Sequence, residues 1–505
     1  MRSGLALLLA TALAIPLPAF AQDAAPQTFD QLAPEIDALF ALYQADAHVP
    51  GLVYGIVKDG KLAYVNGVGV QDLDAKRPVT PDSLFRIASM TKAFTALSIL
   101  KLRDDGKLRL DDLAEDYIPE MKGWTYPTKD SPRIRIRDLL QHVGGLVTDD
   151  PWGDRQQVLP QEDFTNMIAA GVPFSRVPQS SHEYSNFGYA LLGRIVTNAS
   201  GMPYTDYVRQ TILTPLGMTA SGYDVTKAPK ERYARGYRWE NEAWSPEPEM
   251  IDGAFNAMGG LQVSANDYAK WVAFLLSAWP ARDDPDTGPV KRSTVREIAQ
   301  GLNFTSVANR IGSTGADACK QSLAYGMGWR VAQDCDLGLT LAHGGGYPGY
   351  GSHVMLMPDH GVGIFALANR TYAGPSGPAW DTAVAMDKAG LLESRTVPVS
   401  PAVADAFVAV RAAYAAGSLA PLDGRLAMNF LLDRSAENWA AELAQLRRAV
   451  GECPDAQPLA PMGAMSTAFR LDCEKGKLDG MLLLAPTTPA TIQALRLRAV
   501  PPPAP

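Results

Sequence analysis

The stretch FRIASMTK, residues 85–92, places a serine and a lysine three positions apart at the start of a helical pattern that runs to about Leu102. Residues at i and i+3 share one face of a helix, so Lys92 can reach the Ser89 hydroxyl. A serine is a weak nucleophile that needs a base, and a lysine can serve once burial and nearby groups lower its pKa from about 10.4. The stretch therefore predicts a nucleophile, Ser89, at a helix N-terminus whose backbone N–H groups can stabilise an oxyanion.

This spacing is weak evidence alone, because two common residues recur at it by chance. The same helical pattern carries a second serine and lysine at this spacing, Ser98 and Lys101. At about 100° per residue, the nine residues from Ser89 to Ser98 place the two serines on opposite faces of the helix, so the two pairs cannot belong to one site. The position at the helix start favours Ser89.

The triplet Tyr184-Ser185-Asn186 precedes another apolar helical pattern, which begins at Phe187. A phenolate beside a lysine can take the serine proton, and the Asn186 carboxamide can bind a substrate carbonyl while it orients that lysine. The alternative is a core tyrosine beside an asparagine that caps the helix. A similar triplet at residues 64–66 lies in a predicted strand and is a decoy.

A third element, His343-Gly344-Gly345-Gly346, follows the strand-like run Leu337–Leu341. Its glycines let backbone N–H groups approach a ligand closely, and the imidazole could hold a substrate carboxylate or assist proton transfer. The alternative is a glycine-rich hairpin turn with an incidental histidine. An α/β-hydrolase esterase is excluded, because the chain has no G-x-S-x-G and that fold places its HGGG loop before the nucleophile. A zinc motif starting at His182-Glu183 fails because position 186 is asparagine.

Two hairpins are expected, each joining two apolar runs: residues 52–57 with 62–68, through an Asp-Gly turn, and residues 352–357 with 362–368. A helix is expected over residues 34–46, with Pro34 in its first turn. Mostly helix and loop signals lie between the two hairpins. We therefore expect an α+β fold, an antiparallel sheet flanked by helices and interrupted by a helical subdomain.

The composition changes near residue 395, where the linker-like stretch 396–401 precedes an Ala-rich helical pattern. Beyond it, one face of a further helix is expected from the spacing of Trp439, Leu443, Leu446 and Val450. A hairpin is expected to join residues 469–473 with 478–484. The expected organisation is a domain over residues 22–395 and a small C-terminal α+β domain over 396–505 with a Pro-rich tail. No catalytic pattern stands out in the second domain.

The 505 residues are 47% hydrophobic and 20% charged, which is ordinary globular composition and excludes disorder. The net charge is −8 and no basic run occurs, so nucleic acid is not an expected partner. Arg2, the apolar run 5–18 and an Ala-x-Ala site at 19–21 predict a cleaved signal peptide, residues 1–21, and a periplasmic or secreted protein. No later run is long and apolar enough to span a membrane.

Four cysteines fit an oxidising compartment and allow three pairings. Their order and close spacing favour Cys319 with Cys335 and Cys453 with Cys473. Neither pair has the C-x-x-C spacing of a zinc or redox motif, and no pattern indicates a metal or another cofactor.

Taken in order, the three elements resemble the serine β-lactamase and penicillin-binding superfamily, specifically its class C β-lactamase and D-Ala-D-Ala carboxypeptidase group with esterase and D-aminopeptidase relatives. The stretch IRIRDLLQHVGGL, residues 134–146, is similar to that group's ITIRDLLxHTSGL. Residues 184–193, 215–218 and 258–261 also follow its patterns in the expected order. The resemblance covers roughly residues 30–390 and implies a β-lactamase/transpeptidase-like fold.

The resemblance also implies roles for the candidate residues. Ser89 would be the acylated nucleophile with Lys92 as its partner, and Tyr184 would be the general base. Asn186 would bind a substrate amide, and the glycines Gly345 and Gly346 would contact the substrate. The backbone N–H groups of Ser89 and Gly346 would donate to the oxyanion. His343 would occupy the position of the family's K-T-G lysine.

Two departures from the family pattern bear on the substrate. Gly344 replaces the usual threonine or serine, which removes a hydroxyl that would bind a substrate carboxylate. A histidine titrates near pH 6.5, so a charge on His343 would disappear above neutrality. We therefore expect rates on carboxylate-bearing substrates to fall between about pH 6 and 8 relative to neutral esters.

The sequence favours a secreted serine hydrolase that cleaves an ester, an amide or a D-amino-acid peptide, with a small molecule or a peptide as substrate. The alternatives are a class C-like β-lactamase and a non-catalytic penicillin- or peptidoglycan-binding protein on the same fold. A non-catalytic protein should have lost Ser89, Lys92 or Tyr184, and all three are present. The exact substrate, the oligomeric state and the role of the C-terminal domain stay open.

Overall fold

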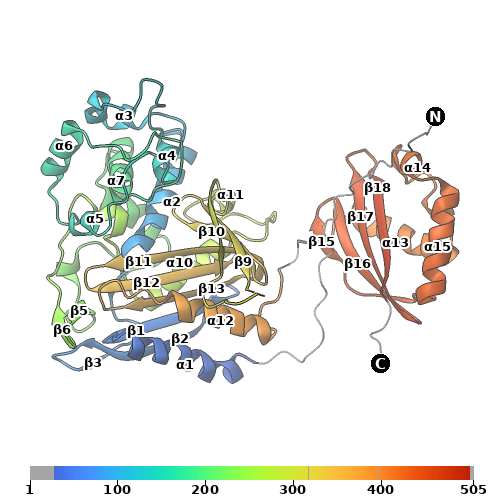
Figure 1. The fold of residues 1–505 in the computed structure, drawn as a ribbon, viewed down its shortest axis with the longest axis horizontal. Helices are drawn as coiled ribbons and strands as arrows, with labels where there is room; N and C mark the ends of the chain where they lie inside the picture. The colour runs from blue at the N-terminus through green and yellow to red at the C-terminus, as the bar shows by residue number, and fades with distance from the viewer. Residues whose placement is uncertain (1–27, 317, 396, 501–505) are drawn as a thin grey trace, which may run out of the picture. The chain divides into compact units, whose positions relative to one another are not determined.

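The computed structural model describes residues 28–316, 318–395 and 397–500. The predicted signal peptide and the Pro-rich end of the tail lie outside these residues. The described chain divides into two compact units, one within residues 25–395 and one within 396–505 (Figure 1). Over these ranges, the longest apolar stretch of any helix falls short of a membrane span.

The first unit is built on a nine-stranded antiparallel sheet in the order β3-β2-β1-β13-β12-β11-β10-β9-β8. Its strands are β1 (Gly51–Lys58), β2 (Lys61–Asp72), β3 (Arg77–Pro78), β8 (Asn303–Asn309), β9 (Lys320–Tyr325), β10 (Arg330–Asp334), β11 (Gly338–Tyr347), β12 (Tyr350–Met357) and β13 (Val362–Ala368). At its centre β1 pairs with β13, with Leu52 opposite Ala368. The predicted antiparallel sheet is confirmed.

Both predicted hairpins of this sheet are confirmed, as β1–β2 and β12–β13. Asp59 and Gly60 have φ of 52° and 76°, the left-handed pair that a two-residue hairpin turn requires. The second turn ends at Gly361, which also has a positive φ, 63°. Local turn chemistry thus set the register of both hairpins.

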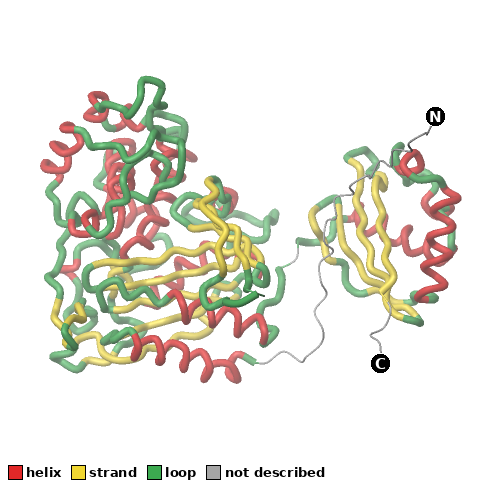
Figure 2. Tube along the Cα trace, viewed as in Figure 1, coloured by secondary structure: helices red, strands yellow, loops and turns green. Residues whose placement is uncertain are grey.

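Helices cover both faces of the sheet (Figures 1 and 2). One face packs against α1 (Phe29–Asp46) and α12 (Ser376–Lys388), and the other against α2 (Thr91–Asp104) and α10 (Ala265–Leu276). Along β13, Ile364 and Ala366 belong to the first core, while Phe365 and Leu367 belong to the second. Because both faces are buried, these strands appear in the sequence as continuous apolar runs.

The helix α1 begins five residues before the predicted start, so the placement of Pro34 in its first turn is wrong. The Thr28 N–H donates to Gln31 Oε1 over 2.8 Å, which satisfies a donor at the earlier N-terminus. Pro34 therefore lies inside the helix. Burial of Leu32 and Ile36 against the sheet stabilises the extended helix.

The sequence between β3 and β8 forms the helical subdomain, which confirms the predicted insertion. Its further helices are α3 (Ala114–Tyr117), α4 (Ile136–Leu140), α5 (Trp152–Arg155), α6 (Gln161–Ala170), α7 (Asn186–Ser200), α8 (Tyr204–Val208), α9 (Asn256–Gly259) and α11 (Arg292–Glu297). It also carries two short ribbons, β4 (Phe85–Arg86) with β7 (Gln262–Val263) and β5 (Tyr237–Glu240) with β6 (Ala243–Pro246).

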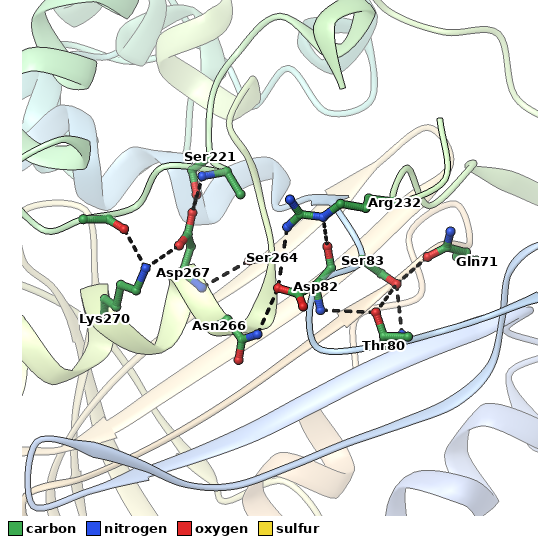
Figure 3. A network of polar contacts seen from close by, with 12 residues as sticks. Gln71, Thr80, Asp82, Ser83, Ser221, Arg232, Ser264, Asn266, Asp267 and Lys270 are labelled. Carbon is green, nitrogen blue, oxygen red and sulfur yellow. Dashed lines mark hydrogen bonds and ion pairs between the residues drawn. The ribbon is translucent and has the colours of Figure 1, made fainter. Parts of the chain in front are cut away.

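The first two residues of the FRIASMTK stretch form β4 of the β4–β7 ribbon, and polar contacts fix both ends of this ribbon (Figure 3). Before β4, the Ser83 hydroxyl donates to Gln71 Oε1 and accepts from the Thr80 N–H. After β7, Ser264 Oγ accepts from the Asp267 N–H over 3.2 Å and caps α10. The chain entering the nucleophile's turn is therefore held on both sides.

The strands β8, β9 and β10 extend the sheet beyond what the sequence predicted. β8 lies at the edge of the sheet and leaves Phe304 and Val307 exposed, so it lacks the alternation that marks a half-buried strand. The favoured pairing of Cys319 with Cys335 is confirmed, and it joins the outer ends of β9 and β10.

The C-terminal unit is an α+β fold of its own. Its sheet has the order β14-β16-β17-β18, with β15 beside β16, and its elements are α13 (Pro401–Ala416), α14 (Phe430–Asp433), α15 (Ala436–Val450), β14 (Asp455–Ala456), β15 (Ala460–Gly463), β16 (Ser466–Cys473), β17 (Gly476–Ala485) and β18 (Thr491–Val500). The four predicted apolar positions of α15 are its buried face, and the predicted hairpin is β16–β17. The favoured Cys453–Cys473 pair is confirmed as well.

Candidate active site

Ser89 lies in a 3₁₀ turn, residues 88–90, that runs straight into α2, so it stands at the helix start as predicted. The preceding residue, Ala88, has a φ of 48°, a left-handed conformation that costs a non-glycine residue energy. Hydrogen bonds on both sides of Ile87 hold this turn: its N–H donates to Leu261 O, and its carbonyl accepts from Ser352 Oγ. The nucleophile is therefore presented by a fixed, strained backbone.

Lys92 is fully buried beneath Ser89, and its Nζ makes three hydrogen bonds. They go to Ser89 Oγ (3.1 Å), Asn186 Oδ1 (2.7 Å) and the carbonyl of Met258 (2.8 Å). Burial lowers the pKa of Lys92 to about 8, with nearby aspartates acting in the opposite direction. The predicted decoy, Ser98, points elsewhere and donates to the Phe94 carbonyl.

Tyr184 immediately precedes α7, and the Nζ of Lys92 lies 4.9 Å from the centroid of its ring. Burial raises the pKa of Tyr184 well above its usual range, and a hydrogen bond with Ser89 acts the other way. The neutral phenol is therefore the favoured form. The sequence suggested a phenolate at this position, whereas the raised pKa favours the phenol, and the triplet itself gives no signal of burial. The role of Tyr184 as general base stays a prediction.

Asn186 begins α7, but the cap of this helix is Ser185, whose hydroxyl accepts from the Gly188 N–H. The Asn186 side chain is fully buried. Its oxygen faces Lys92 as expected, whereas its NH₂ group donates to Asp150 and Asp154. In this arrangement the amide orients the lysine, and its donors do not face a substrate.

His343 lies within β11, opposite Val354 of β12, so the alternative reading of residues 343–346 as a hairpin turn is wrong. Its Nδ1 lies 2.7 Å from the Gly344 carbonyl, and its Nε2 lies 3.1 Å from the Tyr325 hydroxyl. A carbonyl can only accept, so Nδ1 carries the hydrogen and Nε2 accepts from Tyr325. Burial, followed by the charges of Lys92 and Arg330, lowers the pKa of His343 to about 3.

A neutral His343 changes the expected pH dependence. Because its pKa lies far below 6.5, the imidazole does not lose a charge between pH 6 and 8, and the fall expected from the sequence is withdrawn. We now predict that the kcat/KM ratio of a carboxylate-bearing substrate to its neutral ester stays within about twofold over that range. Parallel pH–rate profiles for the two substrates check this, and a ratio that drops steeply near pH 6.5 would contradict it.

The glycines of β11 allow close contact with the nucleophile's turn. A Cβ on Gly345 would lie 2.4 Å from the Ile87 carbonyl and 2.1 Å from Ser352 Oγ, so glycine is required there for packing. A Cβ on Gly346 would lie 2.7 Å from the ring of Tyr372. The pairing of β11 with β10 ends at Ala342, so within the described strands the half of β11 after that residue pairs with β12 alone.

The sequence patterns did not point to several residues around this site. Aspartates 149, 150 and 154 gather around Asn186, and the short, acid-rich TDDPWGD run was their one visible signal. Arg330 on β10 is exposed, and its charge adds to burial in lowering the pKa of His182 and, after burial and Lys92, that of His343. Of the residues described, no carboxylate forms an ion pair with Arg330.

One group of potential metal ligands occurs away from the site, formed by Cys319, Cys335, Asp334 and Asp336. Both sulfurs belong to the disulfide. Asp334 accepts hydrogen bonds from Arg310 and Gln321, which occupy its two oxygens. The group therefore serves as a structural cluster at the end of the β9–β10 hairpin.

Comparisons with known proteins agree with this geometry. The family model described as Beta-lactamase matches residues 36–386. Protein flp of Staphylococcus aureus is 31% identical over 343 residues, which cover 66% of this chain and 62% of that protein. Penicillin-binding protein 4* of Bacillus subtilis is 28% identical over 329 residues, 62% of this chain and 66% of that protein. The chain thus matches less than two thirds of the length of flp.

Two solved structures share the fold. The octameric penicillin-binding protein homologue from Pyrococcus abyssi superposes with a TM-score of 0.58 at 21% identity, covering 92% of this chain and 99% of that one. A class C β-lactamase superposes with a TM-score of 0.57 at 20% identity, covering 74% of this chain and all of that one. Both confirm the expected architecture.

Proposed function

Because this chain belongs to the serine β-lactamase and penicillin-binding family, we propose that it is a serine hydrolase that works through an acyl-enzyme on Ser89. The observation that carries the proposal is the buried Lys92, whose Nζ lies 3.1 Å from Ser89 Oγ. A lysine with a pKa of about 8 has a sizeable neutral fraction near neutral pH. It can therefore act as the base that a serine nucleophile needs.

In the first step, the neutral amine of Lys92 takes the Ser89 proton. Asn186 Oδ1 and the Met258 carbonyl each accept one N–H, which leaves the lone pair directed at Ser89. The Ser89 oxygen then bonds to the substrate carbonyl carbon, and the carbonyl electron pair moves to its oxygen. The N–H groups of Ser89 and Gly346 are the proposed donors to this oxyanion.

Collapse of the oxyanion breaks the bond to the leaving group, which takes the proton held by Lys92. Tyr184 lies beside the lysine as a neutral phenol, so we assign it the role of a proton relay. It donates its hydroxyl proton to the leaving group while it receives the proton from Lys92. Water then attacks the acyl-enzyme by the same sequence in reverse and releases the acid. Every proton removed from a nucleophile is thus returned to a leaving group.

The surroundings favour a substrate with an apolar acyl group and a carboxylate on the leaving side. An apolar hollow of about 240 Å³ lies at the N-terminus of α7, where Ser185 and Phe187 line it together with Leu146, Val147, Asp149, Trp152, Met167, Val172 and Pro173. His343 is neutral, so the candidate cation for a substrate carboxylate is the exposed Arg330, whose charge acts on His182 and, after that of Lys92, on His343. A D-amino-acid peptide or an ester with an acidic leaving group fits both features.

Arg330→Ala should discriminate between substrate types. We expect KM for a carboxylate-bearing D-amino-acid peptide to rise about tenfold or more, since a charged hydrogen-bonding partner contributes about 1.5–3 kcal/mol. A neutral ester with the same acyl group should change less than about twofold, because it offers no anion to the guanidinium. Steady-state kinetics on the two substrates test this, and equal losses on both would remove Arg330 from substrate recognition.

The proposed function is tested by intact-protein and product mass spectrometry of residues 22–505 incubated separately with a neutral ester, a D-Ala-D-Ala peptide and a penicillin. Cleavage of the ester or the peptide, with an acyl adduct on the Ser89 peptide, supports the hydrolase. A hydrolysed penicillin supports the class C-like β-lactamase. Binding with neither adduct nor product supports the non-catalytic protein and refutes the proposal.

We also propose that the protein acts outside the cytoplasm, after cleavage behind Ala21. The two disulfides support this, because they persist in oxidising compartments. We propose further that residues 22–395 form the hydrolase domain and that residues 396–505 form a separate domain, and the two compact units of the described chain support this division.

A further inference from the structure

A chain of hydrogen bonds continues from Lys92 away from the nucleophile. The Asn186 amide accepts from Lys92 on one side and donates to Asp150 and Asp154 on the other, with 3.4 Å between Nδ2 and Asp154 Oδ1. Asp149 accepts from the Asn186 and Phe187 N–H groups at 2.6 and 2.8 Å. Thus three carboxylates surround the residue that orients the lysine.

This arrangement fixes which way the Asn186 amide faces. A flipped amide would direct its NH₂ at the three-donor group of Lys92 and its oxygen at Asp150 and Asp154, which is unfavourable on both sides. The two carboxylates therefore keep the amide oxygen on Lys92. Asp154 is 2% exposed, so its contribution is not weakened by solvent.

Asp154 is itself held by a residue distant in sequence. The Tyr372 hydroxyl donates to Asp154 Oδ2 over 2.9 Å, and the same ring packs against Gly346. Tyr372 has a φ of 55°, an uncommon conformation for a tyrosine, and is 43% exposed. Tyr372 therefore connects the proposed oxyanion strand to the carboxylates behind Asn186.

We propose that Asp154, held by Tyr372, is a positioning residue for proton transfer between Ser89 and Lys92, because it fixes the Asn186 amide and supplies a negative charge facing the lysine. The proposal rests on the proposed function, in which Lys92 is the base. Asp154 does not touch the substrate in this scheme. It acts through Asn186 and through its charge.

The charged groups around Lys92 identify the source of this effect. On the Asn186 side lie Asp149, Asp150 and Asp154, all of which favour the protonated lysine. On the opposite side, burial keeps the pKa of His142 well below its usual range and that of His343 at about 3, so both are neutral near pH 7. Tyr184 is neutral as well. The aspartates therefore set the charge balance at the lysine.

Asp154 also changes its own charge near neutral pH. Burial, followed by the charge of Asp150, raises the pKa of Asp154 to about 7, while the charge of Lys92 and then the Tyr372 hydroxyl act in the opposite direction. Above that pH the ionised carboxylate helps to retain the proton on Lys92. Below it, the neutral acid gives up that effect while keeping its place beside the amide.

The test compares pH profiles of kcat/KM for a neutral ester between wild type and Asp154→Asn. The variant keeps the size of the side chain and removes its charge, so Lys92 should lose its proton more easily. We expect the acid limb to move down by about 0.5–1 pH unit. Tyr372→Phe removes the hydroxyl that favours ionised Asp154, and its acid limb should move the same way by a smaller amount.

A matched control is Asp252→Asn. Asp252 accepts from the Asn256 amide much as Asp154 accepts from Asn186, although Asp252 is exposed, and no contact joins it to Lys92 in the described structure. Its variant should leave the acid limb in place. An equal shift in this control, or a uniform rate loss without a shift in Asp154→Asn, would overturn the proposal.

One further measurement and the second variant keep the outcome unambiguous. Lysine-selective NMR follows the titration of Lys92 without any substrate, with Lys92→Met identifying its signal. A lower lysine pKa in Asp154→Asn supports the proposal even if the proposed reaction fails, and an unchanged pKa refutes it even if the reaction is confirmed. If Asp154→Asn does not fold, the absence of any shift in Tyr372→Phe refutes the proposal.

Discussion

Ser89→Ala is expected to abolish acyl-enzyme formation and to lower kcat/KM by about 10⁴-fold or more, the range found when a covalent nucleophile is removed. The fold should survive, because the change removes one small hydroxyl, and Lys92 keeps its contacts with Asn186 and Met258. Intact-mass spectrometry should show no adduct with any acylating substrate. Thermal unfolding should shift by no more than a few degrees.

The chain supplies its own control for this experiment. Ser98 has the same spacing to a lysine and is also buried, but its hydroxyl donates to the Phe94 carbonyl inside α2. Ser98→Ala should retain nearly full activity and the full acyl adduct. A residual adduct in Ser89→Ala, or a comparable loss in Ser98→Ala, would contradict the assignment of the nucleophile.

Lys92→Met should lower kcat/KM by about 10³-fold or more, because it removes the base while leaving Ser89 in place. It should also destabilise the fold by about 1–3 kcal/mol, since Asn186 Oδ1 and the Met258 carbonyl lose a buried donor. Steady-state kinetics and denaturant unfolding measure the two effects. Lys101→Met is the matched control: its exposed pair with Asp105 contributes little, so both quantities should stay near wild type.

The pH dependence of stability gives this variant a second signature. The folded pKa of Lys92 is about 8, below its unfolded value, so the unfolded chain binds more protons between about pH 8 and 10.5. Stability from this group therefore rises with pH across that interval and is lost as the pH falls to 8. The difference in unfolding free energy between wild type and Lys92→Met should grow over the same interval, and a constant difference would refute the lowered pKa.

Local patterns were enough for much of the fold. Turn residues and apolar runs located the β1–β2 and β12–β13 hairpins, and the burial of Trp439 on α15 followed from its 3.6-residue period. β8 was not predicted as a strand, because this edge strand exposes Phe304 and Val307 and its apolar residues do not alternate. The early start of α1 was not predicted, because it depends on the hydrogen bond between Thr28 and Gln31 and not on the apolar spacing.

Local patterns likewise predicted some features of the active site and not others. The spacing of Ser89 and Lys92 predicted their contact, because three positions along a helix fix the geometry. Nothing local reveals burial, which decides that Tyr184 and His343 are neutral. The contact between Asp154 and Tyr372 joins residues 218 positions apart, so no short pattern could show it.

The central pairing of the sheet constrains the order in which this protein can fold. β1 pairs with β13, and the Gly51 N–H donates to an Asn369 side chain 318 positions later. Until β13 is available, the β1–β2 hairpin lacks the strand that pairs with the free edge of β1. In the folded protein almost every residue of β1 is buried. Such non-local pairing slows folding and leaves an open strand edge that can recruit other chains. Truncation anywhere before Ala368 should therefore yield an aggregation-prone chain, whatever part of the site it retains.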